Sequence, residues 1–148
     1  MRRVNVLRPE LDHASERDGY RWRALRVGQA VGAQRIGGRL YELAAGERTY
    51  PYHFHHGMEE WLLVLAGSPT LRGADGERVL RAGDVVCFPP GPDGAHQVAG
   101  PGTVLLLSAD AAPREPEAIE YPDSGKLGVS PPGRIFRNDD AVDYWEGE

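Results

Sequence analysis

Residues 46–67 read GERTYPYHFHHGMEEWLLVLAG, and this stretch decides the fold. Three histidines fall within four residues of a segment that is otherwise suited to a β-strand. Side chains alternate between the two faces of a strand, so His53 and His55 point one way and His56 points the other. Two imidazoles on one pleated face, about 7 Å apart at their α-carbons, can converge on one metal ion.

A carboxylate follows the histidines at short range. The break at residues 56–58 predicts a hairpin that brings Glu59 or Glu60 back beside the histidines. We choose Glu60 because Leu62 and Val64, on its own face, are apolar, so that this face lines the interior.

A second stretch, residues 83–96, reads GDVVCFPPGPDGAH. His96 begins a strand after a loop rich in Pro and Gly, where a ligand from a distant strand would be placed. Cys87 is interpreted as a small buried core residue, because nothing nearby offers the electropositive setting of a reactive thiolate. Phe88 lies on the opposite face from Cys87, and the pattern leaves open which of the two points inward.

Residues 46–67 and 83–96 together resemble the two motifs of the cupin superfamily. The first motif has Gly, two histidines one residue apart, Glu and Gly; the second has Gly, five residues, Pro, one residue, Gly and His. The gap from Gly46 to His53 is one residue longer than is common, the gap from Gly91 to His96 is two residues longer, and Gly100 replaces a frequent asparagine. The resemblance implies a small single-domain cupin (a monocupin), an all-β protein with an antiparallel β-barrel of the double-stranded β-helix, or jelly-roll, type.

The resemblance also implies one divalent transition metal, held by His53, His55, Glu60 and His96. Three neutral imidazoles and one carboxylate suit Zn, Mn, Fe, Ni or Co better than Ca or Mg. Four ligands leave one or two positions open for water or substrate. His56 is expected at the surface or behind a ligand, and His56 or Glu59 is the alternative should a listed ligand fail. The sequence identifies no catalytic residue.

The 148 residues fit one domain. We expect an N-terminal arm and first strand at 1–39, a barrel core at 40–108 and an extended C-terminal tail at 109–148. Helix content should be low. Strands are predicted at 20–27, 40–44, 50–55, 60–66, 70–72, 79–81, 85–88, 97–99, 103–108, 118–121 and 135–137. The aromatic pair Tyr144 and Trp145 indicates a docked C-terminus.

Two predicted strands, 61–66 and 103–108, are apolar on both faces. One face lines the barrel, and the other needs a cover: a second sheet, the arm or a partner chain, so a homodimer is expected. Residues 1–40 carry nine arginines against four acidic residues, while residues 41–148 carry eight basic against eighteen acidic residues. The arm has no helix-turn-helix pattern or lysine cluster, so no nucleic-acid partner is expected.

Other polar and aromatic residues flank the two motifs. By alternation Tyr50, Tyr52 and Trp61 face away from the metal. Arg72 is interpreted as a solvated edge residue, with a role in anchoring a carboxylate as the alternative. The polar segment 121–126 is a candidate cap for the barrel mouth.

The function expected from these features is that of a metal-dependent enzyme acting on a small polar or carboxylate-bearing molecule, with dioxygenase, isomerase or decarboxylase chemistry left open. The alternatives are a non-enzymatic binding or sensor module and a structural metalloprotein. A polar cavity beside the ion favours the first two. No apolar run approaches the ~20 residues that cross a bilayer, and no signal peptide is evident, so we expect a cytoplasmic protein with a small-molecule ligand.

Overall fold

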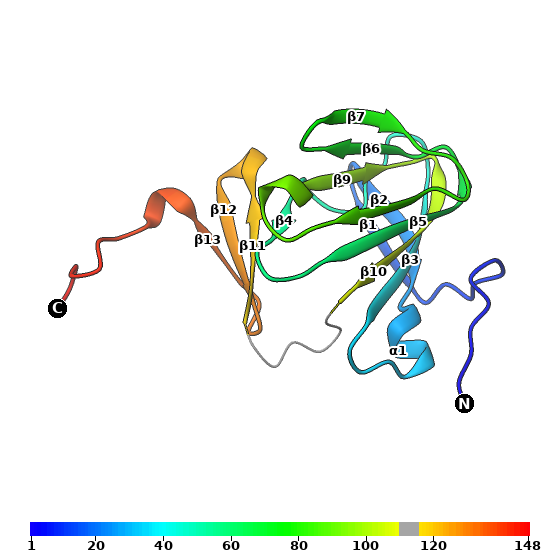
Figure 1. Cartoon of the computed structure of the whole chain (residues 1–148), viewed down its shortest axis with the longest axis horizontal. Helices are drawn as coiled ribbons and strands as arrows, with labels where there is room; N and C mark the ends of the chain where they lie inside the picture. Colours follow the sequence, from blue (N-terminus) through cyan, green and yellow to red (C-terminus); the bar gives the residue numbers. More distant parts are fainter. Residues whose placement is uncertain (110–115) are drawn as a thin grey trace.

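The computed structural model describes residues 1–109 and 116–148 and consists mainly of antiparallel strands (Figure 1). The strands are β1 (His13–Arg17), β2 (Tyr20–Leu25), β3 (Gly37–Leu43), β4 (Phe54–His55), β5 (Glu60–Gly67), β6 (Thr70–Gly73), β7 (Gly76–Val79), β8 (Val85–Phe88), β9 (His96–Ala99), β10 (Gly102–Ser108), β11 (Glu117–Tyr121), β12 (Lys126–Ser130) and β13 (Arg134–Arg137). The helices are α1 (Val27–Val31) and the 3-10 turns η1 (Pro92–Gly94), η2 (Pro122–Ser124) and η3 (Asn138–Asp140).

The strands form three sheets. The largest has the order β1-β2-β3-β10-β5-β8, and the smaller ones have the orders β13-β12-β11-β4 and β7-β6-β9. An isolated bridge from His53, just before β4, to His96 on β9 connects the two smaller sheets. The predicted all-β jelly roll is confirmed, but its sheets are open at their edges and do not close into a continuous barrel.

The main core lies between these sheets. It is built from their inward-facing residues, including Tyr41, Leu62, Val64, Val98 and Val104, each at most 1% exposed. Alternation along β5 and β10 sends every second side chain into this core.

The outer apolar face of β5 and β10 is covered by the chain itself. Val4, Val6 and Leu11 of the N-terminal arm pack on a second cluster formed by Leu25, Leu40 and Leu105 and the neighbouring leucines. Of the covers considered for this face, the arm is the one present in the single chain. The homodimer is not needed for this purpose and stays a prediction.

The strand predictions were correct for most of the chain, with ends shifted by a few residues. The predicted strand 79–81 lies earlier, as β7, and 50–55 is reduced to β4 because Pro51 interrupts it. The predictions missed β1, α1 and β12. Residues 110–115 of the expected tail lie outside the described residues.

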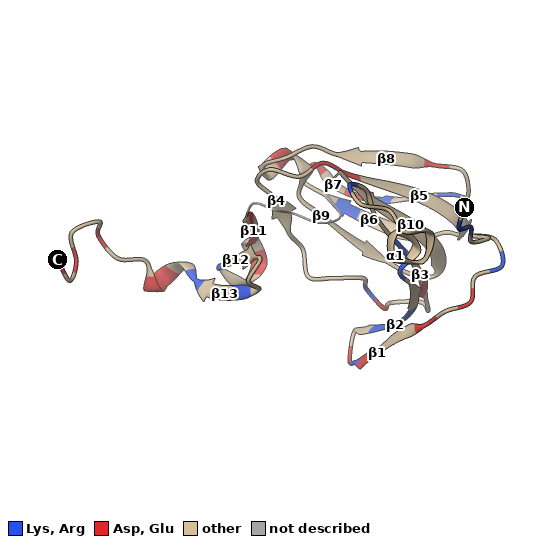
Figure 2. Cartoon of the chain, turned by 90° about the horizontal axis from the view of Figure 1, so that it is seen from below, with Lys and Arg blue, Asp and Glu red and all other residues tan. Residues whose placement is uncertain are grey.

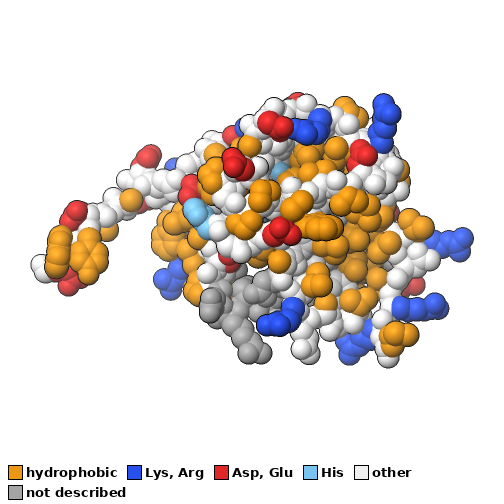
Figure 3. Space-filling model, in the orientation of Figure 1, with side chains coloured by type: hydrophobic (Ala, Val, Ile, Leu, Met, Phe, Trp, Pro, Cys, Tyr) orange, Lys and Arg blue, Asp and Glu red, His pale blue; other side chains and the backbone are white. Residues whose placement is uncertain are grey.

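The C-terminus does not dock on the body. Tyr144 and Trp145 are 83% and 72% exposed and pack edge-to-face on each other, with ring centroids 4.8 Å apart. Figure 3 shows hydrophobic side chains at the end of a projecting tail. Residues 138–148 carry five acidic and no basic residues, as Figure 2 illustrates. The prediction of a docked terminus is therefore wrong for the single chain. None of the helices in the described ranges is long and apolar enough to span a bilayer.

Candidate metal centre

Three predicted ligands converge inside the fold. His53 precedes β4, Glu60 is the first residue of β5, and His96 is the first residue of β9. One ligand atom from each lies within 4.8 Å of those of the other two. His53 and His96 exchange backbone hydrogen bonds of 3.2 and 2.9 Å, which fixes the two imidazoles side by side. Both histidines are at least 93% buried, so the group sits away from bulk solvent.

The tautomers of the two buried histidines suit metal binding. Nδ1 of His53 lies 2.9 Å from the carbonyl oxygen of Pro51, and Nδ1 of His96 lies 2.9 Å from that of Gly94. A carbonyl oxygen accepts only, so each Nδ1 carries the proton and donates. The Nε2 lone pairs are then left free for a cation, the arrangement found around metal-ligating histidines.

The carboxylate of Glu60 completes a set of electron-donating atoms that face one another. Oε2 of Glu60 lies 3.4 Å from Nε2 of His96 and 3.4 Å from Nε2 of His55. A carboxylate oxygen and an imidazole lone pair repel each other unless a proton or a cation lies between them. A divalent ion would satisfy all of these atoms at once, so the residues fit the metal that the sequence predicts.

His55 occupies the rim of this group. Its Nε2 is close to Glu60, but it is not among the three residues whose ligand atoms are mutually close. Its Nδ1 is buried, lies 3.4 Å from Oε1 of Glu117, and makes no hydrogen bond to the described residues. His55 therefore faces the centre beside Glu60. Its side chain needs a small movement to bind the same ion as His53 and His96.

His56 and Glu59, the alternatives to the predicted ligands, point away from the centre. Nε2 of His56 lies 2.8 Å from Oε1 of Glu120, at the surface. Glu59 accepts a 2.8 Å hydrogen bond from the indole of Trp61, which is half-exposed. Alternation along the chain thus orients His56 outward, as the sequence predicts.

The titratable side chains of the centre shift one another's pKa values. Burial favours the protonated acid at Glu60, but a proton on Nε2 of His55 or His96 outweighs it in the metal-free protein and holds the pKa of this carboxyl well below its usual range. Burial lowers the pKa of His53 to about 4, and the neighbouring His96 adds to this effect. Burial also opposes protonation of His55, but Glu60 and Glu117 outweigh it and raise the pKa of that imidazole. At neutral pH, His53 is therefore neutral and lies beside an ionised carboxylate.

Aromatic rings wall the centre. Phe88 stacks on His96, with ring centroids 3.8 Å apart, and Tyr121 stacks on His53 at 6.0 Å. Phe88 points inward because it pairs with Glu60 across β5 and β8, whereas Cys87 pairs with the outward Trp61. Cys87 is exposed, so its interpretation as a core residue is wrong.

Tyr50 also faces the centre, contrary to prediction. Its ring centroid lies 6.0 Å from that of His53, and its hydroxyl accepts a 2.7 Å hydrogen bond from Nη1 of Arg39. The alternation that predicted an outward Tyr50 does not apply, because residues 49–52 are bends with Pro51 among them. Tyr52 does point away, beneath the guanidinium of Arg72.

The C-terminal segment covers one side of the centre. β11 pairs with β4, and Glu117 accepts a 3.1 Å hydrogen bond from the backbone of Gly57. Arg72 donates two hydrogen bonds, of 2.6 and 2.8 Å, to Asp123 in the turn after β11. Arg72 is therefore an anchor for the tail, which replaces its interpretation as a solvated residue. That the segment 121–126 caps the barrel mouth stays a prediction.

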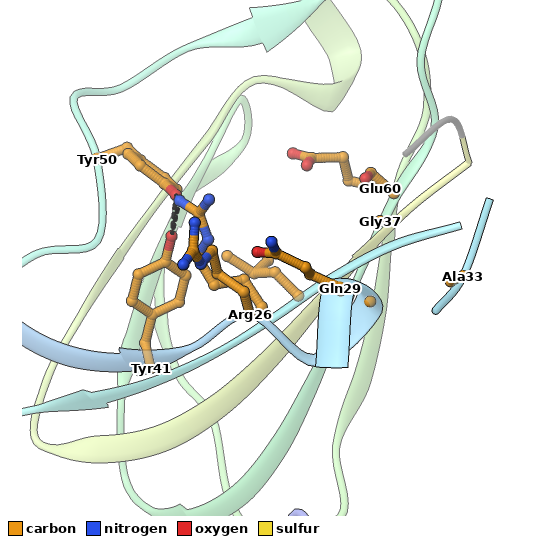
Figure 4. A pocket seen from close by; sticks show the side chains of 12 residues that line it. Arg26, Gln29, Ala33, Gly37, Tyr41, Tyr50 and Glu60 are labelled. Carbon is orange, nitrogen blue, oxygen red and sulfur yellow. Dashed lines mark hydrogen bonds between the residues drawn. The ribbon is translucent and has the colours of Figure 1, made fainter. Parts of the chain in front are cut away.

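A cavity of about 550 Å³ opens beside Glu60 (Figure 4). It extends from Glu60 and Tyr50 to α1 and the start of β3. Polar side chains contribute much of its wall, among them Arg26, Gln29, Arg39 and Ser108. Sequence reasoning missed this cavity, since its arginines lie outside both motifs: Arg26 precedes α1, and Arg39 is on β3.

Comparisons with known proteins agree with this architecture. Residues 39–109 match the family model described as Cupin domain. No curated protein sequence gives a significant match to the chain.

Solved structures resemble nearly the whole chain. A protein of Acidithiobacillus ferrooxidans described as a proposed sugar phosphate isomerase is 24% identical, with a TM-score of 0.77, over 93% of this chain and 89% of its own. A sugar phosphate isomerase from a cupin superfamily, from Silicibacter pomeroyi, is 24% identical, with a TM-score of 0.75, over 92% and 98% of the two chains.

The polyketide cyclase RemF of Streptomyces resistomycificus is 22% identical, with a TM-score of 0.57, over 78% of this chain and 82% of its own. Likenesses of this degree establish the fold. Residues 39–109, which contain His53, Glu60 and His96, thus match a Cupin domain, and the chain shares the fold of these structures over most of its length.

Proposed function

We propose that this protein is a metal-dependent enzyme that acts on a small polar molecule, one oxygen of which reaches a divalent ion held by His53, Glu60 and His96, with His55 as a fourth ligand. The observation that carries the proposal is the convergence of the Nε2 atoms of His53 and His96 with the partly buried carboxylate of Glu60. The adjoining polar cavity supports a ligand-binding role over a purely structural ion.

An ion in this position supplies Lewis acidity, polarising a carbonyl, carboxylate or hydroxyl oxygen. The chain's own residues would do the rest. Glu60 and the histidines would hold the ion, and the backbone hydrogen bonds between His53 and His96 fix the positions of these two imidazoles. Tyr121 and Phe88 exclude water from two sides. Burial raises the pKa of Tyr50, although Arg39 opposes this, so its hydroxyl keeps its proton beside the cavity.

Among the reaction types considered, isomerisation is the first to test. Two structures that match over most of this chain are described as sugar phosphate isomerases, and an isomerase needs no external oxidant. This likeness is one of fold, so it ranks the reactions and does not assign one. A non-catalytic sensor with the same ion is the alternative, and turnover separates the two.

The test begins with metal analysis of the purified protein by mass spectrometry. We expect close to one equivalent of Zn, Mn, Fe, Ni or Co in the wild type and in His56→Ala, whose imidazole faces outward. His53→Ala and His96→Ala should each lose it. A panel of aldose and ketose phosphates is then followed by proton NMR for interconversion or exchange of carbon-bound hydrogen with D₂O.

The outcomes separate cleanly. Metal in the wild type with turnover that vanishes in His53→Ala supports the enzyme. Metal without turnover, but with ligand-induced stabilisation, supports the sensor. Full metal content in both His53→Ala and His96→Ala contradicts the proposed centre.

A further inference from the structure

The cavity beside the metal centre has a positive wall. Arg26 precedes α1, and Arg39 lies on β3; both side chains line the cavity, along with the amide of Gln29 (Figure 4). Glu60 is the acidic residue in the same lining. Two guanidinium groups against one carboxylate leave the cavity positive even before an ion neutralises Glu60.

Arg39 is held without a carboxylate partner among residues 1–109 and 116–148. Its Nη1 donates to the hydroxyls of Tyr50 and Tyr41, at 2.7 and 3.2 Å, and the two hydroxyls also contact each other. Phenols are neutral, so they orient the guanidinium but do not neutralise its charge. The remaining N–H groups of a guanidinium suit the bidentate recognition of a phosphate or a carboxylate.

Arg26 is also incompletely satisfied. Its Nε is buried and makes no hydrogen bond to the described residues, and the nearest carboxylate oxygen, Oδ2 of Asp12, is 3.8 Å away. An orphaned buried donor of this kind costs free energy unless a ligand or water satisfies it. The side chain as a whole is 38% exposed and lines the cavity, so its terminal N–H groups can reach an anion there.

The backbone is built to hold Arg26 and Arg39 near each other. A Cβ on Gly28 would lie 3.0 Å from the backbone nitrogen of Gly38, and one on Gly38 would lie 3.3 Å from that of Gly28. The two glycines therefore let α1 pack directly against β3. This close approach places the start of the helix and the first half of the strand on one cavity.

Tyr50 joins the cavity to the metal centre. Its hydroxyl is bonded to Arg39, and its ring lies edge-on to that of His53, with centroids 6.0 Å apart. A small molecule in the cavity would thus have the metal group at one end and two arginines at the other.

We propose that Arg39 and Arg26 form an anion-binding subsite, which selects small molecules carrying a phosphate or carboxylate at one end and a metal-binding hydroxyl, carbonyl or carboxylate at the other. The inference rests on the proposed function for the metal-binding end. The argument for the arginine end rests only on the cavity lining and on the guanidinium groups of Arg39 and Arg26. Neither has a carboxylate oxygen closer than 3.8 Å among the described residues.

The test measures affinity by calorimetry on the zinc-loaded protein at constant ionic strength. The probes are glycerate, which has a metal-binding group without a distal anion, and 3-phosphoglycerate and malate, which add a distal phosphate or carboxylate. We expect one of the last two to bind at least about tenfold more tightly than glycerate, and which one it is identifies the anion.

The variants are Arg39→Gln and Arg26→Gln, with Arg23→Gln as the matched control, because Arg23 is a 69% exposed arginine on β2. Melting temperature and metal content are measured first for each, and Arg39→Lys, which keeps the charge, is the second variant if Arg39→Gln fails to fold. The preference should fall to about twofold or less in Arg39→Gln and Arg26→Gln, with unchanged glycerate affinity, and should persist in Arg23→Gln. The subsite is overturned if the wild type shows no preference for a distal anion, or if Arg39→Gln and Arg26→Gln leave this preference unchanged.

The arginine subsite can also be tested if the metal proposal fails. If the protein holds no metal, the cavity is tested alone by the rise in melting temperature with inorganic phosphate over chloride at equal ionic strength. A rise that Arg39→Gln and Arg26→Gln abolish supports the subsite. An equal rise in these variants, or none in the wild type, overturns it.

Discussion

Phe88 lies flat against the imidazole of His96, with ring centroids 3.8 Å apart and ring planes 6° apart. The contact joins the hydrophobic core to the metal centre, because Phe88 belongs to the main core cluster. One side chain therefore stabilises the fold and also fixes the orientation of a ligand.

Replacement of Phe88 should weaken both the fold and the binding of metal. We expect Phe88→Ala to lower the free energy of unfolding by about 3–5 kcal/mol, as large core truncations do. Metal affinity should fall as well, since His96 can then rotate. Urea unfolding and metal titration measure the two effects. Phe88→Leu fills most of the space and should cost less than about 1.5 kcal/mol; wild-type metal affinity in Phe88→Ala would contradict this role.

The ion pair between Arg72 and Asp123 should hold the tail rather than the whole fold. Its side chains are 37% and 50% exposed, so Asp123→Asn should change the global free energy of unfolding by less than about 1 kcal/mol. Hydrogen exchange of residues 117–130 should nevertheless become faster, because the turn loses its anchor. Arg78→Gln removes a comparable exposed pair, with Asp75, and is the control. Equal exchange of 117–130 in wild type and Asp123→Asn would show that strand pairing alone holds the tail.

Acid should destabilise the metal-free protein through His53. The folded pKa of about 4 lies below the ordinary value of 6.5, so between these values the unfolded chain binds a proton that the folded chain does not. Stability is therefore unaffected by this group above about pH 6.5 and falls as the pH drops towards 4. At about pH 5 the loss is on the order of 2 kcal/mol.

The measurement compares urea unfolding of wild type and His53→Gln at about pH 7.5 and pH 5. The variant should lose less stability on acidification than the wild type. Glu60 acts in the same direction, but only below its ordinary pKa of 4.5, outside this window. Identical losses in the two proteins would mean that His53 is protonated in the folded state.

Binding of the metal should release a proton if His55 is a ligand. Burial opposes protonation of His55, but Glu60 and Glu117 outweigh it and raise its pKa, and a protonated imidazole must lose its proton to coordinate. Calorimetric zinc titrations in buffers of different ionisation enthalpy count the protons. His55→Ala should bind zinc much more weakly and release fewer protons. Unchanged affinity and full metal retention in His55→Ala would remove it from the ligand set.

Much of the centre could be predicted because its signals are local. Alternation alone orients His56 away from its neighbours, and the apolar face of β5 selects Glu60 over Glu59. Alternation also separates Cys87 from Phe88, but the inward choice depends on the pairing of Phe88 with Glu60, which is a contact between strands. Prediction failed at Tyr50, where Pro51 interrupts the strand and the alternation rule with it.

The sequence by itself determined the strand pattern and the candidate ligands, because side-chain alternation and motif spacing act over a few residues. Only the tertiary structure decided what surrounds them: the arm over β5 and β10, the tail strand on β4, and the cavity with Arg26 and Arg39. Such contacts depend on how distant segments pack, and many different sequences can provide the same covering surface. A short local pattern therefore carries little information about them.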